Sequence, residues 1–126
     1  MKGRTSGIKS FTDLKAWQEG HSLVLDVYKV TESFPKAEVY GLSSQMRRAS
    51  VSVTSNIAEG FSRDSFADKA HFYVMAHGSV TELQNLFHIA RDVDYIDRSK
   101  AEILFLQAEL VYRIISGLIR ASKERR

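Results

Sequence analysis

Two adjacent arginines, Arg47 and Arg48, are the side chains in this 126-residue sequence best suited to binding an anion. A guanidinium group is permanently charged and donates several hydrogen bonds in one plane, which suits a phosphate or a carboxylate. Neighbouring positions on a helix point about 100° apart, so the two side chains cannot share the same surroundings. We expect one arginine to form a structural ion pair with Glu59 or Glu82, and the other to face solvent, a partner subunit or phosphate.

The other basic residues that we single out gather at the two ends of the sequence. The formal net charge is +3, yet residues 1–10 alone carry +3 and residues 113–126 carry +4, which leaves −4 on residues 11–112. Basic ends attract phosphate, although charged termini are often only solvated tails. The candidate nucleic-acid-binding residues are Arg47, Arg48, Lys2, Arg4, Lys9, Arg120, Lys123, Arg125 and Arg126.

No motif in the sequence predicts catalysis or a metal site. The absence of cysteine excludes disulfides and thiolate ligands. None of the histidines is spaced i, i+4 from another, and the Glu-x-x-His pairs of a di-iron bundle are missing. Asp68-x-x-His71 is a single approximation, and Arg63 is too far from His71 for the Arg-His signature of helical-bundle ribonucleases. We therefore predict that the protein is not an enzyme and needs neither a metal nor a cofactor.

The segment from Leu42 to Gly60 carries both arginines and could form a helix or a strand. Residues 50–55 read Ser-Val-Ser-Val-Thr-Ser, which has the two-residue period of a half-buried strand. Over the whole segment, apolar side chains recur at helical steps, at Leu42, Met46, Ala49, Val53 and Ile57. No second alternating run offers a strand to pair with, so we predict a helix that Gly60 terminates.

Three further helices are predicted, over residues 12–34, 65–93 and 99–120. Pro35 ends the first of these, and capping residues precede the other two. Four long helices joined by short loops pack as antiparallel neighbours. The sequence thus predicts an all-α protein, an up-down-up-down antiparallel four-helix bundle.

Each of these helices has an apolar face that we expect to point into the bundle. The first helix presents Leu14, Trp17, His21, Val24, Tyr28 and Thr31. The third carries two apolar rows, which indicates contacts beyond its own bundle. The fourth starts with a capping box at Ser99 and Glu102. Its predicted inner face is Ile103, Leu106, Leu110, Ile114 and Leu118, widened by Leu104, Val111 and Ile115.

The size of the chain fits one domain. Its 126 residues and 14.3 kDa predict a single bundle over residues 1–126, with flexible basic ends over 1–10 and 121–126. The N-terminal segment lacks the apolar run of a signal peptide, and no apolar run approaches the roughly 20 residues that span a bilayer. We therefore expect a cytoplasmic protein that does not contact a membrane.

Five short motifs carry the most specific signal. They are FTDLKAWQ at 11–18, YGL at 40–42, QMRRA at 45–49, SNIAEGF at 55–61 and GSVTEL at 78–83. In order and spacing they resemble a bacterial four-helix bundle family first noticed in intervening sequences of large-subunit ribosomal RNA genes. The family is similar to the accessory variability determinant of diversity-generating retroelements. The chain departs from the family pattern at Thr54, where proline is frequent, at Gln84, where a second acid is usual, and at Asp94, where glycine is usual.

The resemblance implies a protomer that assembles into a ring-shaped homopentamer. For the retroelement relative it implies a basic surface that binds nucleic acid and a reverse transcriptase. We therefore predict a ring-forming, non-catalytic scaffold or adaptor that contacts RNA or DNA weakly through the basic residues named above. A reverse transcriptase or another protein would be a further partner. The alternative is a purely structural or protein-interaction homo-oligomer with no nucleic-acid role.

Overall fold

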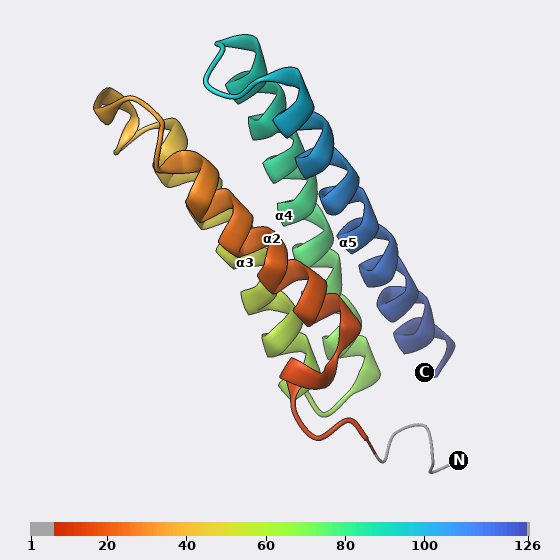
Figure 1. Ribbon diagram of the computed structural model, residues 1–126. Coiled ribbons are helices and arrows are strands. Elements are labelled where there is room, and N and C mark those ends of the chain that lie inside the picture. The colour runs from red at the N-terminus through yellow and green to blue at the C-terminus, as the bar shows by residue number, and fades with distance from the viewer. Residues whose placement is uncertain (1–6, 126) are drawn as a thin grey trace.

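Four helices account for most of the protein (Figure 1). The computed structural model describes residues 7–125, which form α2 (Lys15–Thr31), α3 (Leu42–Ser62), α4 (Phe66–Asp92) and α5 (Arg98–Glu124). Two short 3-10 helices, η1 (Phe11–Asp13) and η2 (Lys36–Glu38), precede α2 and α3. No strand occurs within residues 7–125, so the helix predicted over the alternating Ser-Val segment is confirmed.

Successive helices run in opposite directions and pack against one another. Each contacts the next along the chain, and α2 also packs against α5, which closes the bundle. Figure 1 shows η1, the α3–α4 turn and the C-terminal end of α5 at one end of the bundle. The α2–α3 connection and the α4–α5 turn lie at the other end. The predicted all-α, up-down-up-down four-helix bundle is therefore confirmed.

The predicted inner face of α3 is correct. Every position is buried, at Leu42, Met46, Ala49, Val53 and Ile57. Several residues of this helix are β-branched or serine, which are only moderate helix formers. Because the helix packs against both α2 and α4, tertiary contacts rather than intrinsic propensity stabilise it.

The predicted inner faces of the first and last helices are correct only in part. Thr31 of α2 and the widening residues Leu104, Val111 and Ile115 of α5 are buried as predicted. In α5, Ile103 and Leu106 point outward and are 58% and 59% exposed, and Leu110 is 37% exposed. The residues that α5 buries are Ala101, Leu104, Ala108, Val111, Ile115 and Ser122. Those of α2 are Ala16, Gly20, Leu23, Val27 and Thr31, whereas His21 and Tyr28 are exposed. Both buried faces contain small residues, which let neighbouring backbones approach closely.

Helix α4 buries residues from both of its predicted apolar rows. They are Ala70, Tyr73, Ala76, Val80, Leu83, Leu86, Phe87 and Ala90. Other apolar side chains of α4 stay exposed on the protomer, namely Phe66, Val74, Met75, Ile89 and Val93. The apolar surface of this helix is thus larger than its own bundle covers.

Gly60 does not terminate α3, contrary to the prediction, because the helix continues to Ser62. The glycine instead allows close packing between α3 and α4. A Cβ atom at this position would lie 2.7 Å from Tyr73 Cε1 and 3.2 Å from Phe72 Cβ. Tyr73 is buried, so its ring has little room to move away.

The predicted helix starts agree with the structure in part. Ser65 is the N-cap of α4, as predicted, and its hydroxyl accepts a hydrogen bond of 3.1 Å from the backbone N–H of Asp68. The capping box predicted at Ser99 is wrong. Asp97 caps α5 instead, because its Oδ1 accepts a hydrogen bond of 2.8 Å from the backbone N–H of Lys100.

The α4–α5 turn contains the only non-glycine residue with a positive φ among residues 7–125. Asp94 has a φ of 65°, in the left-handed region that glycine adopts most easily. This conformation gives a physical reason for the glycine that the resemblance leads us to expect at this position. Aspartate is one of the side chains that tolerate the left-handed region best.

A polar and aromatic cluster joins the two connections at this end of the bundle. The Tyr95 hydroxyl donates a hydrogen bond of 2.8 Å to Glu38 Oε2, and the Tyr95 ring packs 5.2 Å from the ring of Phe34. Glu38 Oε1 accepts a second bond of 2.9 Å from the backbone N–H of Leu42. These two hydrogen bonds, the one from Leu42 first, lower the pKa of the Glu38 carboxyl. The cluster fixes the start of α3 and with it the helix that carries the arginine pair.

Candidate nucleic-acid interface

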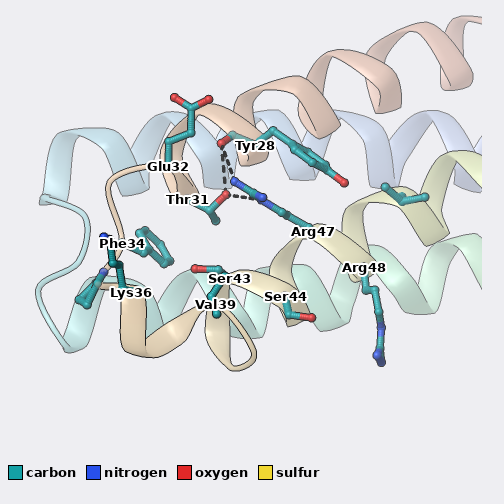
Figure 2. A pocket seen from close by; sticks show the side chains of 12 residues that line it. Tyr28, Thr31, Glu32, Phe34, Lys36, Val39, Ser43, Ser44, Arg47 and Arg48 are labelled. Atoms are coloured by element: carbon teal, nitrogen blue, oxygen red, sulfur yellow. Dashed lines mark hydrogen bonds between the residues drawn. The ribbon is translucent and has the colours of Figure 1, made fainter.

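Arg47, near the N-terminal end of α3, reaches across to α2. Its Nε–H donates a hydrogen bond of 2.8 Å to Thr31 Oγ1, and its Nη2 donates a longer bond of 3.4 Å to the Tyr28 carbonyl oxygen. The guanidinium carbon lies 4.5 Å from the centre of the Tyr28 ring, close enough for a cation–π contact. Figure 2 shows the side chain between the two helices, directed at Thr31 and Tyr28.

Thr31 fixes the position of this guanidinium group. Its hydroxyl donates a hydrogen bond of 2.8 Å to the Val27 carbonyl oxygen, which leaves the hydroxyl oxygen free to accept from Arg47. Thr31 is buried in the last turn of α2. The end of one helix therefore orients a cationic group carried by the next.

The ion pair predicted for one of the arginines is wrong. Glu59 pairs with Arg63, the residue that directly follows α3, and Glu82 is exposed on α4. Within residues 7–125, neither Arg47 nor Arg48 forms an ion pair with a carboxylate. The sequence of α3 alone gives no sign that Thr31 and Tyr28 of another helix hold Arg47.

Arg48 lies in different surroundings, as the angle between adjacent helical positions predicts. Its side chain is exposed, and Figure 2 shows it pointing away from the Arg47–Thr31 contact. The arginine pair thus divides into one guanidinium held against the protein and one that projects into solvent. The projecting group is available to a partner without loss of an internal contact.

An open concavity of about 900 Å³ surrounds Arg47. The last part of α2, the α2–α3 connection and the first part of α3 form its walls (Figure 2). Its lining residues are Tyr28, Thr31, Glu32, Phe34, Pro35, Lys36, Val39, Ser43, Ser44, Arg47, Arg48 and Val51. Three cationic groups and one carboxylate belong to this set, so its formal charge is positive.

The basic residues predicted at the chain ends form a second group. Lys9, Arg120, Lys123 and Arg125 are all exposed. Helix α5 extends to Glu124 and buries Ser122, while the flexibility expected for residues 121–126 stays a prediction. Lys2, Arg4 and Arg126 lie outside the described residues. Because η1 and the end of α5 are at the end of the bundle opposite the α2–α3 connection, the structure separates this group from the arginine pair (Figure 1).

Within residues 7–125, His77 is the one histidine whose side chain forms a hydrogen bond with another residue. Its Nε2 lies 2.9 Å from Ser116 Oγ, and its ring stacks on Tyr112 with 3.6 Å between centroids. Burial lowers the pKa of His77, so its neutral form is favoured. No three His, Asp or Glu side chains within residues 7–125 are grouped closely enough to hold a metal ion.

Tyr40, the first residue of the YGL motif in the α2–α3 connection, is 96% exposed. Among the described residues, none of the helices combines the length and the apolar character that crossing a bilayer requires.

The fold and the candidate site define a class of protein, an antiparallel four-helix bundle with cationic groups displayed at both ends. The family model described as 23S rRNA-intervening sequence protein matches residues 12–117, and the chain belongs to this family. The resemblance found in the sequence is confirmed to that extent, while the similarity to retroelement proteins stays a prediction.

A solved structure shares the fold. It is the crystal structure of a protein with unknown function from the S23 ribosomal protein family of Bacteroides thetaiotaomicron. It has a TM-score of 0.74 and 18% sequence identity, and the alignment covers 82% of this chain and 97% of that chain. No curated protein matches the chain.

Proposed function

We propose that this protein is a non-catalytic scaffold or adaptor that assembles into a ring of identical subunits and contacts RNA or DNA weakly through its basic residues. The observation that carries the proposal is the apolar surface that the protomer leaves uncovered. Leu106 is 59% exposed, Ile103 is 58% exposed and Leu25 of the neighbouring helix α2 is 53% exposed. Burial of such side chains by a second copy would remove them from water.

The distribution of this apolar surface supports a ring. One set of exposed apolar side chains belongs to α5 and α2, and another belongs to α4, where Val74, Ile89 and Val93 are 48%, 42% and 48% exposed. Two different surfaces on each subunit allow head-to-tail contacts, which close into a ring when the rotation per subunit permits. Five subunits is the number that the family resemblance implies.

The basic residues support the nucleic-acid part of the proposal. Arg48 and the four exposed basic residues at the other end, Lys9, Arg120, Lys123 and Arg125, could contact phosphate groups. A ring repeats each of these positions, so contacts that are weak singly would add through multivalency. The resemblance to the retroelement protein implies a reverse transcriptase as a protein partner. Without nucleic-acid binding, the same ring would be a purely structural or protein-interaction module.

The assembly is tested by placing a charge on the exposed apolar row of α5. Leu106→Glu should lower the mass measured by light scattering, because a carboxylate buried between subunits would lack a partner. Its helical content should not change, since Leu106 is exposed on the protomer. Ser55→Glu puts the same charge on an exposed position of α3 and is the matched control. Equal masses for wild type, Leu106→Glu and Ser55→Glu would contradict an interface at this row.

A further inference from the structure

We infer that the concavity around Arg47 is a binding site for a nucleotide, with the phosphate held beside Arg47 and Ser43 and the base against the apolar walls. This deepens the proposed function and rests on it in taking nucleotides as the ligand class. The inference adds a binding pocket with named lining residues, whereas the proposed function relies on exposed basic side chains. The volume of about 900 Å³ lies within the range of roughly 300–1,000 Å³ that small-molecule sites occupy.

The first argument is the state of Arg47. A half-buried guanidinium normally pairs with a carboxylate, but this one is held by a hydroxyl and a carbonyl oxygen, so no carboxylate offsets its positive charge. Thr31 and Tyr28 occupy Nε and Nη2, and Nη1 has no hydrogen-bond partner among residues 7–125. An oriented guanidinium with a free donor is suited to accept an anion at little entropic cost.

The second argument is Ser43, which lines the same concavity. Its hydroxyl makes no hydrogen bond within the described part of the chain, and the oxygen is not among the buried atoms that lack a partner, so it is open to the concavity. Ser43 lies in the first turn of α3, where backbone N–H groups have no partner within the helix. Glu38 accepts from Leu42 and the Gly41 carbonyl oxygen accepts from Gln45, so the N–H groups of Ser43 and Ser44 remain for a ligand. Together these donors favour a phosphate oxygen.

The third argument is the remaining wall of the concavity. Phe34, Pro35, Val39 and Val51 supply apolar surface next to the cationic groups. Lys36 and Arg48 add positive charge at the same site, whereas Glu32 is the one carboxylate in the lining. A ligand with a compact anionic group and a flat apolar body matches this combination. A nucleotide has this composition, either as a free mononucleotide or as an unpaired nucleotide of an RNA strand.

The test is calorimetric titration of the full chain with AMP, with adenosine and with inorganic phosphate at one fixed ionic strength. AMP should bind once per protomer and more tightly than either of its parts. Ser43→Ala and Arg47→Gln should each weaken AMP binding, Arg47→Gln by roughly tenfold, which corresponds to about 1.4 kcal/mol. Glu32→Gln should tighten it. Arg113→Gln, at an exposed position of α5 outside the concavity, is the matched control and should have no effect.

Ser43→Ala and Glu32→Gln keep the test valid if Arg47→Gln destabilises the fold. A 5′-phosphorylated oligoadenylate distinguishes the two sources of the nucleotide. Displacement of AMP by the oligonucleotide assigns the site to an RNA strand, and AMP binding without displacement assigns it to a free nucleotide. Two results would overturn the inference. One is an affinity for AMP no higher than that for adenosine, and the other is an equal affinity for AMP in wild type, Ser43→Ala and Glu32→Gln. If AMP fails these tests but the protein still binds oligonucleotides in a salt-dependent way, the inference is wrong and the proposed function is retained.

Discussion

The close approach of α3 and α4 at Gly60 gives the sharpest stability prediction. In a helix interior, replacement of glycine by alanine normally stabilises by about 0.5–1 kcal/mol, because the unfolded chain loses freedom. At Gly60 the new methyl group would lie 2.7 Å and 2.9 Å from two carbons of the buried Tyr73 ring. Overpacking of this kind costs about 1–3 kcal/mol. The net expectation for Gly60→Ala is a loss of about 0–2.5 kcal/mol.

Gly78 offers a matched comparison within the same bundle. It lies in the interior of α4, and a Cβ atom there would meet nothing within 4 Å. Gly78→Ala should therefore raise the free energy of unfolding by about 0.5–1 kcal/mol. Urea unfolding of both variants and wild type, followed by far-UV circular dichroism at one protein concentration, measures the difference. If the two variants have equal free energies of unfolding, the close packing of α3 on α4 at Gly60 is refuted.

Two further predictions concern charge. The hydrogen bonds from Leu42 and Tyr95 lower the pKa of the Glu38 carboxyl from its ordinary value of 4.5. The ionised carboxylate therefore stabilises the fold above pH 4.5, and this stabilisation is lost as the pH falls through the folded-state pKa. Thermal melts across this acid range should thus show a steeper loss for wild type than for Glu38→Gln, and parallel curves would contradict the role of the carboxylate. A variant with glutamine at Lys9, Arg120, Lys123 and Arg125 should bind oligonucleotides less tightly and with a shallower dependence on salt, because fewer counterions are released. Substitution is preferable to truncation, since truncation would remove Ser122, which α5 buries. Lys29→Gln is the control. An unchanged dependence of oligonucleotide affinity on salt concentration would exclude the basic end of the bundle as the contact.

The sequence alone predicted the fold class and the buried face of α3 correctly, because the apolar residues of α3 lie in a single row. Leu42, Met46, Ala49, Val53 and Ile57 form one apolar row on α3, so only one orientation of the helix can bury them. On α5, Leu104 and Val111 compete with the row of Ile103 and Leu106. Both rows have helical spacing, and the choice depends on how closely the neighbouring helices approach.

The candidate site was predictable only as a pair of arginines. Sequence spacing correctly separated Arg47 from Arg48, because adjacent helical positions face different directions. It could not identify Thr31 as the partner of Arg47, since that contact depends on the packing of α2 against α3. The concavity was not foreseen for the same reason, as its walls come from two helices and their connection.

The measurement that tests the account most directly is the mass of the wild-type protein in solution. The chain has a mass of 14.3 kDa, and the proposed ring predicts a single species of about five times this value. Sedimentation equilibrium at micromolar concentration, at both low and high salt, gives that mass independently of molecular shape. An interface formed by the apolar residues of α2, α4 and α5 should survive high salt, because hydrophobic contacts are not screened. A species of 14.3 kDa under both conditions would contradict the ring and the function proposed for it.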